Sequence, residues 1–334
     1  MKSVLLSSLL ITTLFFSIPL STFAQSIDGL RNPIEDRLSI TIFPQIPKPG
    51  QTITVEVRSS TLALERATIS WFVNNKAFQS GVGLTKIESK TGVSGSSSTF
   101  RAVVSLDGEK YEKSRRISPA SVDLIWQARS YTPPMYKGKA LFPYQGEVTV
   151  VAMPDMVENG VRLSSKNLIY TWKANGTRLK DSGGVGKNSI TVESDVIVRP
   201  IELSVEVLSI SGRTAASQSI VLEYTEPEVI LYEDNPLYGP LYHQSLGGSI
   251  NLQNQEIWIK AAPYYFSTTN HHADNTVAFD WNINSGSTGQ RQSTIILRHA
   301  GEQSGQSVLS VKTTSPNRVM QSSASSLTIN FNSQ

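Results

Sequence analysis

The chain has 334 residues, with 30 Lys and Arg against 27 Asp and Glu, so its net charge is only +3. This small and scattered charge argues against a nucleic-acid-binding protein. The sequence holds no cysteine, which excludes disulfides, thiolate metal sites, a lipidated cysteine and a cysteine nucleophile. Because a single core rarely grows beyond roughly 250 to 300 residues, several domains are expected.

The amino terminus, residues 1–24, predicts a signal peptide. Lys2 supplies the positive start, and residues 4–23 carry no charge and are largely apolar. Small residues before the expected cut place cleavage after Ala24. An uncleaved anchor is the alternative, because about 20 apolar residues would span a bilayer, and we expect no other contact with a membrane. Residues 25–37 are polar without periodicity and predict a flexible lead.

Alternation of apolar and polar residues predicts strands in a first domain at residues 38–130. The expected strands are an early one at 52–57, a tryptophan-bearing one at 67–75, a late one at 100–104 and a closing one at 121–126.

Two proline-containing segments predict stiff joints between domains. Tyr131 to Gly138 follows the first expected closing strand and Tyr224 to Pro227 follows the second, and both begin Tyr-Thr-x-Pro. Proline restricts the backbone and lacks an amide donor. These joints place a second domain at residues 131–226 and a third at 227–334.

The second and third domains repeat the strand pattern of the first. Their expected early strands are 147–154 and 256–263, their tryptophan strands 168–176 and 277–286, their late strands 201–207 and 308–311, and their closing strands 219–224 and 326–331. Few stretches have helical apolar periodicity longer than a turn or two, which indicates an all-β protein.

The repeat is clearest around Trp71, Trp172 and Trp281. These residues are 101 and 109 positions apart (172 − 71 and 281 − 172), which is one β-sandwich domain per copy. Each tryptophan follows an apolar residue two positions earlier, so both side chains share one face of a strand and the indole is expected in the core. Asn lies three positions after each tryptophan, where its tolerance of positive φ predicts a hairpin turn.

The motif Tyr170-x-Trp172-x-x-Asn175-Gly176, followed by Gly-x-Gly, resembles that of PKD domains and related bacterial immunoglobulin-like modules. The first copy departs from it with Ile69 in place of the aromatic residue, and the third has a looser glycine pattern. The resemblance implies three tandem immunoglobulin-like or PKD-like β-sandwiches, as in uncharacterised secreted bacterial proteins. It also implies domains that space, present or adhere rather than catalyse.

We expect no catalytic residue, no metal site and no cofactor. The four histidines include the pair His271-His272 near Asp274, which could bind zinc. However, adjacent histidines on an extended strand point to opposite faces. The cluster from Lys113 to Arg116 is expected to be a solvated strand or loop edge. Sequence motifs of nucleophilic hydrolases, phosphate-binding loops and calcium loops are absent.

Binding is the harder class to exclude, because tyrosines gather at the start of the third domain. Tyr242, Tyr264 and Tyr265 are the candidate ligand contacts, since exposed rings can stack on sugars or act as protein hot spots. The alternative is that the rings pack the joint between the second and third domains.

The sequence therefore predicts a non-catalytic protein exported to the periplasm, cell surface or exterior. We expect a semi-rigid spacer or adhesion scaffold whose protein or glycan partner the sequence does not name. A carbohydrate-binding protein is the alternative, and a secreted hydrolase is a more distant one.

Overall fold

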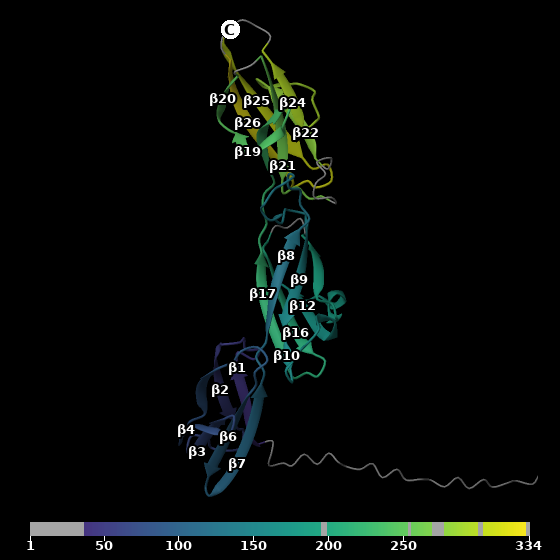
Figure 1. The fold of residues 1–334 in the computed structure, drawn as a ribbon. Coiled ribbons are helices and arrows are strands. Elements are labelled where there is room, and N and C mark those ends of the chain that lie inside the picture. Colours follow the sequence, from purple (N-terminus) through teal and green to yellow (C-terminus); the bar gives the residue numbers. More distant parts are fainter. Residues whose placement is uncertain (1–36, 195–198, 253–254, 269–276, 300–302, 332–334) are drawn as a thin grey trace, which may run out of the picture.

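The computed structural model describes residues 37–331 apart from 195–198, 253–254, 269–276 and 300–302. The expected signal peptide and all of the expected lead except Arg37 lie outside the described residues. Figure 1 shows three β-sandwiches in an elongated row, with the first set to one side and the second and third stacked end to end. In the described part of the chain, no helix is long and apolar enough to cross a membrane.

The first domain packs a three-stranded sheet against a four-stranded sheet. Their strand orders are β1-β2-β5 and β4-β3-β6-β7, and all pairs are antiparallel. Alternate residues of β2 are buried because side chains point to opposite faces of a strand. The bounds are β1 Ser39–Phe43, β2 Thr52–Arg58, β3 Thr68–Val73, β4 Lys76–Val82, β5 Lys86–Lys90, β6 Ser98–Leu106 and β7 Glu109–Ile117.

The second domain repeats this arrangement with the sheets β15-β9-β8 and β13-β12-β16-β17, and β14 also pairs with β12. A small hairpin, β10-β11, stands apart. The bounds are β8 Ser121–Ala128, β9 Glu147–Asp155, β10 Val157–Glu158, β11 Val161–Arg162, β12 Leu168–Ala174, β13 Thr177–Arg178, β14 Gly184–Val185, β15 Ser189–Glu193, β16 Ile201–Ser209 and β17 Ala215–Leu222, with 3₁₀ turns η2 Ser165–Asn167 and η3 Lys180–Ser182.

The third domain has a four-stranded sheet, β19-β18-β21-β24, and a five-stranded sheet, β20-β26-β25-β22-β23. Strand β20 joins β26 in parallel, whereas the other pairs are antiparallel. The bounds are β18 Glu228–Asn235, β19 Gly239–Leu246, β20 Ser249–Leu252, β21 Glu256–Tyr264, β22 Ala278–Ile283, β23 Gly286–Ser287, β24 Thr294–Arg298, β25 Gly305–Thr314 and β26 Ser322–Phe331.

Each sandwich has a separate hydrophobic core, and each core contains one of the repeated tryptophans. Trp71, Trp172 and Trp281 are no more than 1 % exposed. Two packed sheets with one buried tryptophan per domain are the architecture of the immunoglobulin-like sandwich. The chain is thus an all-β protein of three tandem immunoglobulin-like domains.

The three indoles perform the same structural task. Each indole Nε1 donates a hydrogen bond to a backbone oxygen that lies just before an edge strand of the opposite sheet. The acceptor residue is two positions before the first residue of that strand. The acceptors are Leu84 before β5 (2.9 Å), Lys187 before β15 (3.0 Å) and Gln292 before β24 (2.9 Å). A buried indole N–H requires such a partner, so this bond ties the two sheets of each domain together.

The asparagine after each tryptophan strand also acts alike in all three domains. Asn74, Asn175 and Asn284 have φ values of 51°, 49° and 48°, and a residue of positive φ follows each of them. Each Oδ1 accepts a backbone N–H from the neighbouring strand, from Thr99 of β6 at 2.9 Å, Glu202 of β16 at 2.9 Å and Val308 of β25 at 2.8 Å. The asparagine therefore makes the turn and fixes the adjacent strand.

The expectation that residues 121–126 close the first domain is wrong. They form β8, which pairs with β9 of the second domain along its whole length. The first domain is closed instead by β7, which pairs with β6. Most of β7 is charged or polar and exposed, as suits an edge strand, so apolar alternation did not reveal it. The expected domain boundary after residue 130 accordingly falls after β8, whereas the strand pairing changes domain between β7 and β8.

The segment from Tyr131 to Gly138, expected as the joint between the first and second domains, also lies elsewhere. It lies in the β8–β9 connection, inside the second domain, and not between the first and second domains. Tyr131 exchanges backbone hydrogen bonds with Phe266 and Tyr265 of the third domain. The segment thus contributes to the second junction of the molecule.

Candidate functional site

The first junction joins β7 to β8 through residues 118–120 and is bridged by side chains. Lys48 Nζ donates to Gln218 Oε1 at 2.6 Å, and Ser94 Oγ donates to the backbone oxygen of Asp155 at 3.0 Å. Gly95 lies against Val157 so closely that an added Cβ would come within 2.8 Å of the valine side chain. Among the described residues, no backbone–backbone hydrogen bond crosses this junction.

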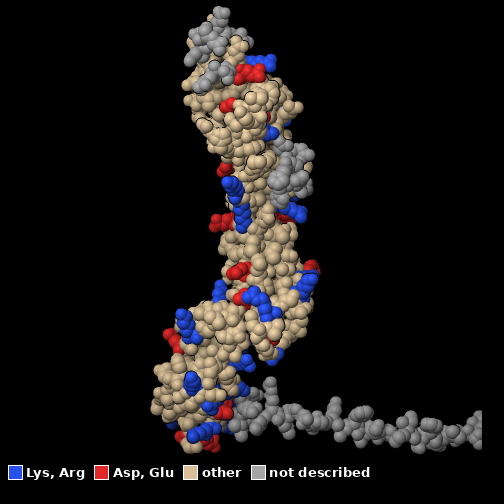
Figure 2. Space-filling model, viewed as in Figure 1, with Lys and Arg blue, Asp and Glu red and all other residues tan. Residues whose placement is uncertain are grey.

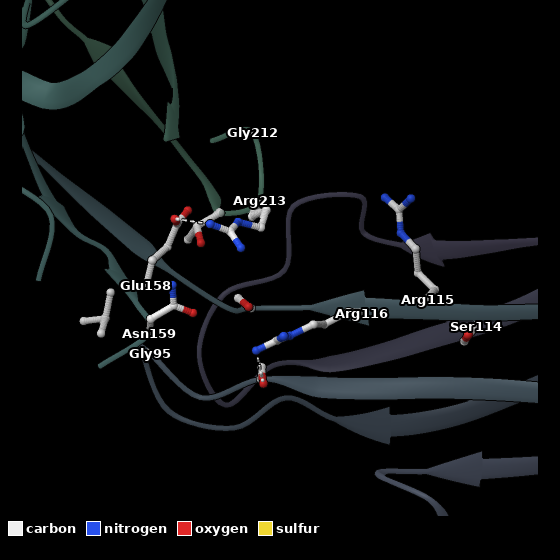
Figure 3. Close-up of a pocket in the computed structure, with 12 residues that line it drawn as sticks. Gly95, Ser114, Arg115, Arg116, Glu158, Asn159, Gly212 and Arg213 are labelled. Atoms are coloured by element: carbon white, nitrogen blue, oxygen red, sulfur yellow. Dashed lines mark hydrogen bonds and ion pairs between the residues drawn. The ribbon is translucent and has the colours of Figure 1, made fainter. Parts of the chain in front are cut away.

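A cleft of about 360 Å³ lies between the two domains at this junction (Figure 3). Its walls come from the β5–β6 loop, β7 and the linker on one side, and from the β10–β11 hairpin and the β16–β17 loop on the other. The lining residues are Gly95, Ser97, Ser114, Arg115, Arg116, Ser118, Val157, Glu158, Asn159, Gly212, Arg213 and Thr214.

The cleft is positively charged, because Arg116 and Arg213 direct their guanidinium groups into it and Glu158 is the one acidic residue among its lining residues. Arg115 lies at the rim, with its side chain turned away from these groups. Arg116 extends from the first domain toward the second and donates through Nη2 to Ser97 Oγ at 3.0 Å. Arg213 faces it from the second domain, with its Nη2 3.9 Å from Glu158 Oε2. The side chain of Arg115 forms no hydrogen bond or ion pair with any residue that the structure describes, whereas its backbone pairs with Phe100 in the sheet.

Glu158 is held as a carboxylate by hydroxyl groups beneath it. Ser211 Oγ lies 2.8 and 2.9 Å from its two oxygens. The nearby hydroxyl groups of Ser209, Ser211 and Thr214 lower the pKa of Glu158 despite the opposing effect of burial, and the charge of Arg213 lowers it further. This carboxylate neutralises part of the charge of Arg213 and leaves Arg115 and Arg116 without an acidic partner in the lining.

In the sequence, Arg115 and Arg116 stand out only as part of a basic cluster expected at a solvated edge. The structure places them on exposed positions of the edge strand β7, which is consistent with that expectation, but at the rim and wall of a cleft. Arg213 is almost a hundred positions away in the chain, in a Ser-Gly-Arg loop that carries no distinguishing pattern. No sequence signal brings these residues together.

The second junction is built differently, with backbone hydrogen bonds across it. The amide of Tyr131 donates to the oxygen of Phe266 at 2.7 Å, and the amide of Tyr265 donates back to the oxygen of Tyr131 at 2.8 Å. Residues 130 and 267 form an antiparallel bridge beside this exchange. The β8–β9 connection of the second domain thus pairs with the segment after β21 like a short strand.

A glutamine from each domain also crosses the second junction. Gln321 is 1 % exposed, and its amide nitrogen donates to the backbone oxygen of Tyr144. Its Oε1 accepts the amide of Ser267 at 2.8 Å. Gln145 returns the contact, since its Oε1 accepts the amide of Met320 at 2.9 Å.

The predicted tyrosine contacts lie at and beside the second junction. Tyr264 is 7 % exposed and shares a 2.8 Å hydroxyl contact with Tyr232. Tyr136 of the second domain packs edge-on against Tyr264 and Tyr265, with ring centroids 5.7 and 6.4 Å apart, and its hydroxyl lies 2.7 Å from that of Tyr265. Tyr242 packs on Tyr232 at 5.1 Å. Most of the Tyr264 ring is therefore covered by protein, whereas Tyr242 and Tyr265 are half-buried.

The histidines considered for zinc fall partly outside the described residues. His271, His272 and Asp274 are among the residues that the structure leaves undescribed. His243 is exposed, and His299 stacks on Phe331 at 4.5 Å. In the described ranges, no three His, Asp or Glu side chains group so as to hold a metal ion.

Comparisons with known proteins do not assign the chain to a family. No family model matches the chain, and no curated protein matches it. Among solved structures, it is similar to three N-terminal domains of the bacteriophage RB49 highly immunogenic outer capsid protein, with 13 % identity and a TM-score of 0.27 over 89 % of this chain and 99 % of that one. It is also similar to the central fibronectin-III array of RIM-binding protein, with 10 % identity and a TM-score of 0.28 over 87 % and 95 % of the two chains. A third is the fibronectin(III)-like modules of Clostridium thermocellum CbhA, with 10 % identity and a TM-score of 0.27 over 56 % and 94 %. At such scores these similarities carry no argument about function.

Proposed function

We propose that the chain is an exported, non-catalytic scaffold that holds binding surfaces at a set distance in the periplasm, at the cell surface or outside the cell. The observation that carries this proposal is the second junction, where backbone exchange between Tyr131 and the segment after β21 aligns two sandwiches end to end. The uncharged amino-terminal segment supports export.

The finer family assignment is also a proposal. A buried indole bonded to the chain before the facing strand, with a turn asparagine three residues later, recurs in all three domains. This recurrence supports descent from one PKD-like module. A spacer needs such independent domains in series, since each can be added without disturbing the core of its neighbour.

Rigidity is tested by measuring distances between two labels. Because the chain has no cysteine, Val185→Cys on β14 and Val308→Cys on β25 give a single labelled pair across the second junction, and both positions are well exposed. We expect a narrow distance distribution by pulsed electron spin resonance. A distribution as broad as that of two domains on a flexible linker would contradict the spacer.

Export is tested separately in the producing cells. Fractionation should recover the chain outside the cytoplasm, with Gln25 as its first residue if cleavage follows Ala24. Recovery in the cytoplasm with Met1 intact would contradict export and leave the rigidity measurement unaffected.

A further inference from the structure

The cleft at the first junction has the composition of a binding site for an anion. Arg116 belongs to the first domain and Arg213 to the second, and both side chains extend into the space between them (Figure 3). Guanidinium groups bind carboxylate and phosphate through paired hydrogen bonds. Clefts between domains are also a preferred location of small-molecule sites.

We propose that this cleft binds an acidic sugar, carrying a phosphate or a carboxylate, and that the bound sugar bridges the first and second domains. In this arrangement Arg116 and Arg213 contact the anionic group from opposite walls. Arg115, at the rim, adds positive charge beside the cleft and so increases the attraction for the anion. This binding activity goes beyond the proposed spacer role.

The rest of the lining favours a hydroxylated ligand. Ser97, Ser114 and Ser118 supply hydroxyl groups and Asn159 supplies an amide, all of which can exchange hydrogen bonds with sugar hydroxyls. Val157 is the one apolar side chain larger than a methyl group in the lining, and no aromatic ring is present there. An acyl chain would therefore find little apolar surface, and a nucleobase would find no ring to stack on. A cleft of about 360 Å³ lies within the size range of small-molecule sites.

The location of the cleft gives binding a mechanical consequence. In the described structure, the first junction is held by side-chain contacts such as that between Lys48 and Gln218, without backbone exchange. A ligand held by both walls adds contacts that exist at one inter-domain angle only. Binding should therefore narrow the range of angles between the first two domains.

The charge distribution over the surface agrees with this location. Figure 2 shows Lys, Arg, Asp and Glu side chains gathered over the first domain and the adjoining end of the second, whereas the visible face of the third domain carries few of them. Because residues 37–117 contain 12 Lys and Arg against 6 Asp and Glu, the first domain has a net positive charge that attracts anionic ligands toward its junction with the second.

The binding test uses the full mature chain and calorimetric titration at low ionic strength. The probes are glucose 6-phosphate, glucuronate, neutral glucose and polyglutamate. We expect saturable binding of at least one of the two acidic sugars, weakened by added salt, and no binding of glucose. The ratio between the two acidic sugars identifies phosphate or carboxylate as the preferred group.

Matched variants locate the site. Arg116→Gln and Arg213→Gln should each weaken binding by about tenfold or more, whereas Arg178→Gln, an exposed arginine on β13 outside the cleft, should leave it unchanged. Thermal melting checks that each variant is folded. Equal affinity of the two cleft variants and the native chain, or absence of saturable binding by both acidic sugars, would overturn the proposal. Tighter binding of polyglutamate than of either sugar would also overturn it, in favour of an acidic peptide.

The mechanical consequence is tested with Val82→Cys on β4 and Val185→Cys on β14, both exposed. Saturating acidic sugar should narrow the label distance distribution across the first junction and leave that between Val185→Cys and Val308→Cys unchanged. An unchanged distribution across the first junction would show that the ligand does not bridge the domains. None of these outcomes alters the rigidity of the second junction, so failure here is distinguishable from failure of the spacer role.

Discussion

The two junctions of this molecule connect similar domains by different means. At the first, a short linker of residues 118–120 leaves the described domains in contact through side chains around an arginine-lined cleft. At the second, residues 223–227 form a longer linker, yet backbone bonds, a buried glutamine and packed tyrosines cross it. Linker length therefore does not determine how firmly two domains are held. The contacts made by neighbouring loops do, because they restrict orientation whereas a linker restricts only separation.

The largest effect is expected from replacing a core tryptophan. Trp71→Ala and Trp172→Ala should each cost about 3 to 5 kcal/mol in their own domain, through lost burial and a cavity. Trp71→Ala should leave the melting of the second and third domains unchanged. Trp172→Ala should also lower the stability of the third domain, because the second junction couples the two.

Differential scanning calorimetry, with hydrogen exchange to assign each transition, measures both effects. Trp281→Ala is the reciprocal control and should lower the stability of the second domain. If Trp172→Ala left the third domain unaffected, the second junction would be no stronger than the first.

A second test compares one glutamine at each junction. Gln321→Ala removes a buried amide that contacts Tyr144 and Ser267, and should cost about 1 to 3 kcal/mol because their polar groups lose a partner. Gln218→Ala removes a half-exposed contact with Lys48 and should cost less than about 0.5 kcal/mol. Urea unfolding followed by tryptophan fluorescence measures both. Similar costs would remove the distinction between the junctions.

The third test uses alkaline pH. Burial, followed by the hydrogen bond with Tyr232, raises the pKa of Tyr264 well above its usual value of 10.0. Because the folded pKa is the higher one, the stabilisation is complete below about pH 10 and is lost as the pH rises through the folded pKa. We expect the third domain to lose about 1.4 kcal/mol per pH unit above pH 10 from this residue.

Tyr264→Phe supplies the control, because it keeps the ring and removes the ionisable hydroxyl. Thermal melts between pH 9 and about 11 should show a shallower decline for the third domain of this variant. An unchanged slope would assign the alkaline loss to other groups.

The smallest expected effect concerns a glycine pair in the first domain. Gly95 and Gly108 have φ values of +81° and +86°, so alanine at either costs about 1 kcal/mol in backbone strain. An added Cβ meets nothing within 4 Å at Gly108, but meets Val157 of the second domain at Gly95. We expect Gly95→Ala to rotate the first domain away from the second, because changing the angle between the domains costs less free energy than distorting the backbone.

Label distances between Val82→Cys and Val185→Cys measure this rotation. They should shift in Gly95→Ala and stay at the native value in Gly108→Ala. A native distance together with a larger loss of stability in Gly95→Ala would show that the first junction is rigid.

Much of the fold could be predicted from local pattern. Alternation located the early strands, and the tryptophan-to-asparagine spacing located the three domains, because a buried indole and a positive-φ turn require those residue types at those positions. The missed closing strand β7 shows the limit of this signal. An edge strand with charged residues satisfies its backbone bonds on one side only and needs little apolar surface.

The candidate cleft could not be predicted, since its residues share no local pattern. Arg115 and Arg116 are recognisable in the sequence as a basic pair. Arg213 becomes a candidate only from the fold, because β8 belongs to the second sandwich and the β16–β17 loop of that sandwich lies at the same junction. The same redirection moved Tyr136 from an expected first joint to the second, beside Tyr264 and Tyr265.

Local sequence pattern is enough to specify three similar β-sandwiches, because the alternation of side chains and the turn at each asparagine act within a few residues of the chain. Which sandwich β8 joins, which loops meet at each junction and where the arginines converge are settled by the three-dimensional fold. Those outcomes depend on pairing between distant segments, where strands of similar composition compete and the total packing of both sheets selects among them.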